Sequence, residues 1–454
     1  MQKTKKRIKG TNIFIAINIL VLLSIIGYYG SRLVHYYKLE HPKIETLVNK
    51  TMSDVLTSDA NVVFEGDGLY KTGDNYTFRG KELNNYVYYS GRIWRIIGVN
   101  PDKSIRIITD ESQTSITWGI NNDYNDSYIK NWLMPNDEDM SGIFYKSLNN
   151  PEEYIQDGDF CKDIIVEEKI TCEDRITAKI GLLSYNEYEA ANGENSYLNN
   201  ETNWWTMNGS SKSTALFITD DGSISNSTII GKTYESFGVR PVINLRGNLT
   251  IVSGDGSINT PYIFENESSG TLNNRNIGEY IKYNDYTFRI IDKDEKSVRV
   301  AMDGFIKKDN EEVLEHYSNQ INKYSPDNTQ IGYYLNNDFY NSLENKDYIV
   351  ESDWQIGQYN DYVNFDYTNT NYRTVSAKIG LLKVGDLFTN DYSDYSLITG
   401  ESSITKTIYT VTKSGSLESI SIQEKMHIRP SFNLKADLTI SSGKGTKNDP
   451  YVIG

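Results

Sequence analysis

An internal repeat constrains the fold of this chain more than any other feature of its sequence. Six stretches of the first half recur in the second half in the same order, with spacings that differ by only a few residues. Chance does not readily produce six ordered matches, so the pattern predicts two homologous modules, 62–267 and 272–454. The matching stretches are 86–97 and 280–291, 104–107 and 297–300, 144–148 and 339–343, 178–183 and 377–382, 240–245 and 429–434, and 260–263 and 449–452.

Each module opens with a pattern typical of β-hairpins. Ser90-Gly91 and Asn284-Asp285 stand between aromatic and β-branched runs, as two-residue hairpin turns do. Short helices are predicted at 128–134 and 330–336, each behind a Ser or Thr cap, and another follows the capping-box pattern that begins at Ser184. The sequence therefore predicts an α+β fold of mostly antiparallel sheet with short helices.

The N-terminal region contains an uncharged apolar run from Asn12 to Tyr29. Extended to Val34, a helix would be about 34 Å long, close to the roughly 30 Å hydrocarbon core of a bilayer. We predict a basic cytoplasmic tail at 1–11, a transmembrane helix at 12–34 and a juxtamembrane stalk at 35–61. The positive charges before the run predict a single-pass protein of the cell membrane with extracellular modules. A cleaved secretory signal is the alternative.

The net charge limits the choice of partners. The chain has 46 Lys and Arg against 61 Asp and Glu, which gives a formal net charge of −15. Such a chain is repelled by phosphate backbones, which argues against nucleic acid as a partner. The predicted partners are the membrane, through the N-terminal helix, and a cell-wall, glycan or protein ligand.

Cys161 and Cys172 are the only cysteines. The residues between them suit two short strands joined by a charged turn, and outside a cell such a pair typically forms a disulfide. The bridge would contribute roughly 2–3 kcal/mol of stability. A metal site is disfavoured because no histidine lies nearby.

The sequence contains no recognisable catalytic set. Its four histidines are scattered and do not stand at the spacing of a Ser-His-Asp or Cys-His arrangement. No phosphate-binding loop or zinc signature is present either. We therefore assign no catalytic residue, no metal ligand and no cofactor.

Trp204 and Trp205, with Tyr197 and Asn203 nearby, are the predicted ligand-binding residues. Aromatic faces stack on the apolar faces of sugars or peptides, and amides add hydrogen bonds. Adjacent side chains of a strand face opposite sides, so we expect one indole ring in the core and the other at the surface.

Four further residues are predicted to have structural roles. Arg240 and Arg429 precede proline at matching places in the two modules, and each is expected to bond carbonyl oxygens or a carboxylate inside its own module. Trp94 and Phe288 also occupy matching places, and both are predicted to be core aromatic residues.

Three segments of module 1 and the closing residues of the chain resemble a known family. The strand 94–97, the segment 180–183 and the stretch 239–245 resemble uncharacterised modules on the surfaces of Gram-positive-type bacteria, as does the ending 443–451. That family looks distantly like the C-type-lectin and formylglycine-generating-enzyme fold. The resemblance implies a compact, loop-rich α+β module and no settled activity.

Taken together, these features predict a membrane-anchored bacterial surface protein. Its modules are expected to be non-catalytic and to bind a ligand, in an adhesin-like or envelope-associated role. Two alternatives stay open, an extracytoplasmic enzyme that acts on an envelope component and a structural surface spacer.

Overall fold

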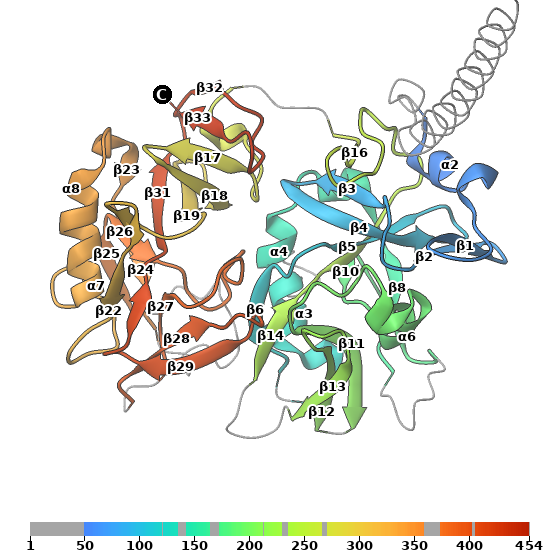
Figure 1. Ribbon diagram of the computed structural model, residues 1–454, viewed down its shortest axis with the longest axis horizontal. Helices are drawn as coiled ribbons and strands as arrows, with labels where there is room; N and C mark the ends of the chain where they lie inside the picture. The colour runs from blue at the N-terminus through green and yellow to red at the C-terminus, as the bar shows by residue number, and fades with distance from the viewer. Residues whose placement is uncertain are drawn as a thin grey trace, which may run out of the picture.

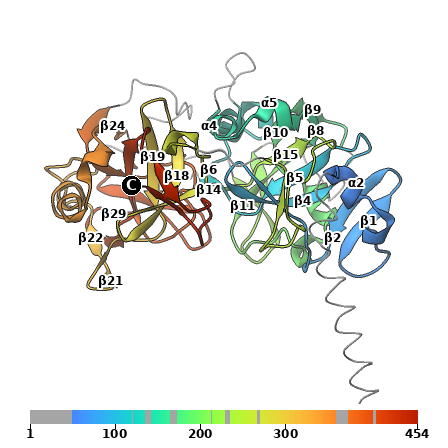
Figure 2. The same cartoon turned by 90° about the horizontal axis from the view of Figure 1, so that it is seen from above.

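The computed structural model describes two units that lie side by side (Figures 1 and 2). The described part of module 1 runs from residue 62 to 265, with residues 50–61 before it, and that of module 2 runs from 272 to 453. The described residues are 50–119, 121–134, 142–163, 172–211, 213–228, 235–265, 270–357, 373–401 and 405–453.

The predicted α+β fold class is wrong, because the described part of the chain is mostly β-sheet. Strand accounts for 41% and helix for 15%. The capping patterns that predicted helices do begin helices, but these are short. Helices α3 (Tyr128–Leu133) and α6 (Tyr185–Ala190) each have 6 residues. They therefore connect strands and do not form a layer of their own.

The N-terminal predictions fall largely on residues that the structure does not describe. The predicted transmembrane helix at 12–34 and the basic tail at 1–11 lie outside the described residues. No helix within the described residues is long and apolar enough to cross a membrane. Of the predicted stalk, the end from residue 50 forms helix α2 (Met52–Leu56) and turn η2 (Asp59–Asn61), and it packs on module 1 through the fully buried Met52.

Module 1 is built on a nine-stranded sheet with the main order β1-β2-β4-β5-β15-β10. Strand β3 pairs with β4 and β16, and β7 pairs with β15. The β3–β4 connection is the predicted two-residue turn, because Tyr89 pairs directly with Arg92. The bounds are β1 Gly68–Thr72, β2 Asn75–Arg79, β3 Tyr86–Tyr89, β4 Arg92–Val99, β5 Ile105–Thr109, β7 Ile155–Gln156, β10 Ile180–Gly181, β15 Val242–Leu245 and β16 Tyr262–Ile263.

Module 2 repeats the centre of this sheet. Its main order is β23-β31-β19-β18-β17-β33-β32, and β26 pairs with β31. Strands β17, β18, β19 and β31 stand where β3, β4, β5 and β15 stand in module 1, and β18 has a register shift after Ile290 where β4 has one after Ile96. The bounds are β17 Tyr280–Tyr283, β18 Tyr286–Lys293, β19 Ser297–Met302, β23 Ile349–Val350, β26 Ile379–Leu381, β31 Pro430–Lys435, β32 Ile440–Ser442 and β33 Tyr451–Ile453.

Smaller sheets complete each module. Module 1 has a five-stranded sheet of order β13-β12-β11-β14-β6 and a hairpin, β8–β9. Module 2 has the three-stranded sheet β27-β28-β29 and the hairpins β20–β21, β22–β30 and β24–β25. The bounds are β6 Thr114–Thr117, β8 Gly158–Cys161, β9 Arg175–Ala178, β11 Trp204–Ser211, β12 Thr214–Ile218, β13 Ile224–Thr228, β14 Ser236–Val239, β20 Lys307–Lys308, β21 Glu311–Glu312, β22 Leu314–His316, β24 Ser352–Gln355, β25 Thr374–Ala377, β27 Ser396–Gly400, β28 Thr407–Val411, β29 Leu417–Ser421 and β30 Lys425–His427.

The remaining helical segments are short connections. Helix α7 begins at its predicted cap, Thr329, whose hydroxyl accepts a hydrogen bond from the backbone nitrogen of Gly332 at 3.2 Å. The bounds are η3 Tyr124–Asp126, α4 Ile143–Lys146, α5 Pro151–Tyr154, η4 Gly193–Asn195, η5 Leu272–Asn274, α7 Gln330–Tyr333, the π-helical η6 Tyr334–Phe339, α8 Tyr340–Ser342 and η7 Lys346–Tyr348.

The two modules meet at a contact made by two glycines. Gly91, in the β3–β4 turn, lies so close to module 2 that a Cβ atom on it would stand 2.5 Å from the carbonyl oxygen of Ile277. A Cβ atom on Gly278 would stand 2.5 Å from the carbonyl oxygen of Gly91. Only glycine at both positions lets the two backbones approach this closely.

Phe388 of module 2 is the aromatic anchor of the same interface. Its backbone nitrogen donates to the carbonyl oxygen of Gln113 in module 1 at 2.5 Å. The centre of its ring lies 3.6 Å from the guanidinium carbon of Arg289 and 5.3 Å from that of Arg92 in module 1. The φ of Phe388 is 62°, which is unusual for a bulky residue. Its contacts with the two guanidinium groups and its backbone hydrogen bond hold the residue in this conformation.

Candidate functional site

The predicted ligand-binding tryptophans lie in the core of module 1. Trp204 and Trp205 are both fully buried, so the expectation that one of them would be exposed is wrong. They do face opposite sides of β11, but both sides are covered. Trp204 packs against Tyr188, with ring centres 5.8 Å apart, and Trp205 packs against Phe237 at 4.7 Å. Neither ring offers a face to a ligand.

The other two members of the predicted set are also engaged within the protein. Tyr197 is 5% exposed, and its hydroxyl donates to the carbonyl oxygen of Ile96 at 3.2 Å. Asn203 lies at the interface between the modules, where its backbone nitrogen donates to the carbonyl oxygen of Ser414 at 2.8 Å. Three of the four residues are therefore buried in the core, and the half-buried Asn203 is engaged in the contact between the modules.

Arg240 and Arg429 occupy equivalent buried places. Arg240 Nε donates to the carbonyl oxygen of Thr109 at 3.0 Å, and Arg429 Nε donates to that of Met302 at 2.8 Å. Thr109 and Met302 are themselves matching positions. Burial lowers the pKa of Arg240 to about 10, which leaves it charged near neutral pH. Each arginine thus bonds the last residue of one central strand, β5 or β19, from its place just before β15 or β31.

Trp94 and Phe288 are the matching central aromatic residues of the two sheets. Both are fully buried. Trp94 Nε1 donates to the carbonyl oxygen of Tyr89 at 3.0 Å, which satisfies its only polar atom within the β3–β4 hairpin. Phe288 packs against Phe432, with ring centres 4.9 Å apart, and needs no such partner.

Cys161 and Cys172 are joined by a disulfide that closes the β8–β9 hairpin of module 1. Module 2 contains the same hairpin, β24–β25, without the bridge. Ala178 pairs with Gly158 in the first hairpin, and Ala377 pairs with Ser352 in the second. The sequence comparison missed this equivalence because the two hairpins share few residue types outside the Ala pair.

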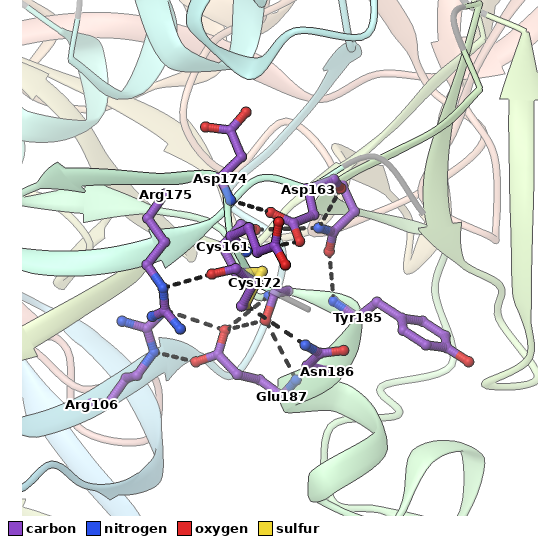
Figure 3. The surroundings of a disulfide bond; sticks show 12 residues. Arg106, Cys161, Asp163, Cys172, Asp174, Arg175, Tyr185, Asn186 and Glu187 are labelled. Carbon is purple, nitrogen blue, oxygen red and sulfur yellow. Dashed lines mark hydrogen bonds and ion pairs between the residues drawn. A yellow bond between two sulfur atoms is a disulfide. The ribbon is translucent and has the colours of Figure 1, made fainter. Parts of the chain in front are cut away.

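A cavity of about 560 Å³ opens beside the disulfide and is the candidate functional site of module 1. The first β8 residues, the disulfide and the start of helix α6 all contribute to its wall. Figure 3 shows Arg106 and Glu187 below Cys172, with Arg175 on one side and Asn186 on the other. Its charged lining residues are Asp102, Arg106, Asp157, Asp159, Arg175 and Glu187.

An ion pair between a buried arginine and a half-buried glutamate forms the floor of this cavity. Arg106 is 7% exposed, and its Nη2 atom lies 3.2 Å from Glu187 Oε2, while its Nε atom donates to the other carboxylate oxygen. The guanidinium carbon also stacks 4.5 Å from the ring centre of Phe160. Glu187 in turn accepts the backbone nitrogen of Ser184 at 3.0 Å, as the capping box predicted. These contacts fix both charges in place.

The charge inside the cavity is negative on balance. Four carboxylates, those of Asp102, Asp157, Asp159 and Glu187, face two guanidinium groups. Partial burial of Asp102 opposes ionisation, but hydrogen bonds from Ser104 and Gln156 prevail and lower its pKa. It is therefore ionised near neutral pH. The arrangement can bind polar or cationic groups.

No other chemistry stands out in the part of the chain that the structure describes. Within those residues, no group of three His, Cys, Asp or Glu side chains is placed to hold a metal ion. The sequence reasoning missed the cavity, although one signal pointed to it. Arg106 and Glu187 match Arg299 and Asp386, so both copies keep opposite charges at the same two places.

Comparisons with models of protein families, with characterised proteins and with solved structures find no match to this chain. The resemblance to bacterial surface modules and to the C-type-lectin fold therefore stays a prediction.

Proposed function

We propose that this chain is a non-catalytic binding protein that acts outside the cytoplasm, and that module 1 takes a small polar ligand in the cavity beside the disulfide. The observation that carries the proposal is the cavity itself. Its volume lies in the range of small-molecule sites, and its walls are polar and charged. A cell-wall, glycan or peptide fragment has the matching chemistry.

The proposal is supported by the rigidity of the cavity wall. The disulfide fixes one side, and the ion pair of Arg106 with Glu187 fixes the floor. A site whose side chains are already held in place loses less conformational entropy when a ligand binds. The disulfide also supports a location outside the cytoplasm, where such bonds persist.

A pair of matched variants of the full-length protein tests the proposal. Asn186 lines the cavity, whereas Glu189 lies on the same helix, is exposed and is not part of the cavity wall. We would screen monosaccharides, amino sugars and amino acid derivatives by ligand-observed NMR with the wild type, Asn186→Trp and Glu189→Trp.

We expect at least one compound to bind the wild type and Glu189→Trp equally, and to bind Asn186→Trp about tenfold more weakly or not at all, because the indole fills the cavity. Binding that both variants retain, or no binding by any polar compound, would overturn the cavity as the site. Conversion of a bound compound into a product would overturn the non-catalytic role.

A further inference from the structure

We infer that the cavity of module 1 binds a primary ammonium group of its ligand, because module 2 fills the equivalent place with the ammonium group of its own Lys383. The inference rests on the proposed function, since it names the chemistry of the ligand for that same cavity.

The correspondence between the two places follows from the strand register. Strand β10 pairs Ile180 with Ile243 on β15, and β26 pairs Ile379 with Phe432 on β31. The segments that follow β10 and β26 therefore begin from the same point on the two sheets. Counted from there, Ser184 of module 1 corresponds to Lys383 of module 2.

The surroundings of Ser184 and Lys383 also correspond. The ion pair of Arg106 with Glu187 is repeated as Arg299 with Asp386, whose closest nitrogen and oxygen atoms are 2.8 Å apart. Arg106 stacks on Phe160, and Arg299 stacks on Trp354 with its guanidinium carbon 5.0 Å from the ring centre. The two places therefore contain the same three groups, a guanidinium group, a carboxylate and an aromatic ring.

In module 2, the place equivalent to the cavity is filled by side chains of the module itself. Lys383 Nζ donates to Gln355 Oε1 at 2.5 Å, and Gln355 stands where module 1 has Cys161. The backbone nitrogen of Lys383 donates to Asp386 Oδ2 at 2.9 Å, as that of Ser184 does to Glu187. Burial lowers the pKa of Lys383, and the carboxylates of Asp386 and Asp292 oppose this effect without reversing it.

Module 1 has shorter side chains at the same places. Ser184 replaces the lysine, Cys161 replaces the glutamine, and Gly98 replaces Asp292. The residues of module 1 that correspond to Lys383 and its neighbours line the cavity. They are Ser184, Cys161, Glu187 and Arg106. The volume that the lysine side chain fills in module 2 is thus available to a ligand in module 1.

The charge of the cavity suits an ammonium group. Four carboxylates against two guanidinium groups leave two negative charges in the cavity. Module 2 has carboxylates at the places of Asp159 and Glu187, namely Asp353 and Asp386. An ammonium group has three donors and no acceptor, so it needs carboxylate, hydroxyl or amide oxygens around it. Glu187 and Ser184 supply such oxygens at the floor, and Asp157 and Asp159 supply them on the β8 side.

Two kinds of ligand carry this group, an amino sugar and a lysine-type side chain of a peptide. The experiment measures binding to the full-length protein by isothermal titration calorimetry and NMR, with one charged and one uncharged probe of each kind. The amino sugar arm compares glucosamine with glucose. The peptide arm compares Nα-acetyl-lysine methylamide with Nα-acetyl-norleucine methylamide.

We expect the charged probe of one arm to bind at least about tenfold more tightly than its uncharged mate, since a charge-assisted hydrogen bond supplies that much discrimination. The arm with the larger ratio identifies the source of the ammonium group. An equal affinity of charged and uncharged probes in both arms would overturn the inference.

Two substitutions at one position separate charge from volume. Ser184→Lys gives module 1 the residue of module 2 and places a resident ammonium group in the cavity. Ser184→Met has a similar length without the charge, and both changes remove the same hydroxyl cap. We expect Ser184→Lys to weaken the charged probe by about a hundredfold, and Ser184→Met to weaken it clearly less.

The outcomes distinguish the inference from the proposed function. If charged and uncharged probes bind with equal affinity and Asn186→Trp abolishes their binding, the cavity is a binding site and the ammonium inference is wrong. If no probe binding responds to Asn186→Trp or to either Ser184 variant, the proposed function fails and the inference fails with it. If Ser184→Lys and Ser184→Met weakened binding of the charged probe equally, the lost cavity volume would explain the effect, and the role of charge would be contradicted.

Discussion

At the scale of single residues, the most unusual group is Glu279, a carboxylate buried beside the glycine contact between the modules. It is 6% exposed, and its Oε2 atom accepts the backbone nitrogen of Asn276 at 2.7 Å. Burial raises its pKa from 4.5 to about 7, against the opposing effect of the hydrogen bonds from Asn276 and the charge of Arg275, and Glu265 of module 1 raises it further. Its proton is therefore bound more tightly in the folded protein than in the unfolded chain.

This difference predicts how stability depends on pH. Between pH 4.5 and about 7 the folded state holds more protons at Glu279 than the unfolded state, so this group's contribution to stability falls as the pH rises through that window. Glu279→Gln mimics the protonated form and removes the loss. We expect the variant to match the wild type near pH 4 and to exceed it by about 1–3 kcal/mol near pH 8, as measured by denaturant unfolding.

The exposed Glu189 provides the matched control for this experiment. Glu189→Gln should follow the wild type at every pH. If the free energy of unfolding of Glu279→Gln differed from that of the wild type by the same amount from acid to alkaline pH, the raised pKa of Glu279 would be contradicted.

At the scale of elements, the two equivalent hairpins differ in one feature, the disulfide. The bridge links Cys161 and Cys172 in module 1, whereas β24–β25 of module 2 keeps the same pairing without one. The strands of the hairpin are thus specified by their own packing, with Phe160 against Gly181 in one copy and Trp354 against Gly380 in the other. We therefore expect the hairpin to form without the bridge and the bridge to add stability to it.

We therefore predict that the double substitution of Cys161→Ser and Cys172→Ser preserves the fold. The free energy of unfolding should fall by roughly 2–3 kcal/mol, because the open chain gains conformational freedom in the unfolded state. Far-UV circular dichroism and denaturant titration measure the two quantities. Loss of the β-sheet signal at neutral pH would contradict the prediction, and so would an unchanged denaturation midpoint.

The elements also show how far sequence alone could go. The turns at Ser90-Gly91 and Asn284-Asp285 and the capped starts of α3, α6 and α7 were predictable, because local turn and cap chemistry specifies them. The balance of sheet over helix was not, because a cap marks where a helix begins and says little about its length. The internal repeat predicted the two modules, but it did not reveal the hairpin β24–β25, which shares few residue types with β8–β9.

The candidate site was harder to predict than the fold. The two adjacent tryptophans suggested one exposed ring, since strand geometry alone turns them to opposite sides. Tertiary packing then covered both sides, with Tyr188 and Arg240 on one and Trp118 and Phe237 on the other. The cavity arises where Arg106, the β8–β9 hairpin and helix α6 converge, and such a meeting of distant segments has no local sequence signal.

At the scale of the whole molecule, the two modules are expected to unfold together. Phe388 joins them through its backbone bond to Gln113 and through its ring between Arg289 and Arg92. Trp132 of module 1 adds a hydrogen bond from its Nε1 atom to the carbonyl oxygen of Gly385 at 2.8 Å. These contacts couple the stability of each module to that of the other.

We predict that Phe388→Ala uncouples the modules. Loss of the buried ring should cost about 3–5 kcal/mol, and a single calorimetric transition of the wild type should divide into two. Tyr333→Ala, at a position that is 53% exposed, should leave one transition at nearly the same temperature. Two separate transitions in the wild type, or one unchanged transition in Phe388→Ala, would refute the coupling.

The contact of Gly91 with Gly278 has a consequence for how this molecule would present a captured ligand. Because the two backbones are in direct contact, no side chain lies between them that could change conformation and let one module rotate against the other. We therefore expect the mouth of the cavity in module 1 to keep a constant orientation relative to the outer surface of module 2. A partner that binds the outer surface of module 2 would then meet the ligand in module 1 at one fixed distance and orientation.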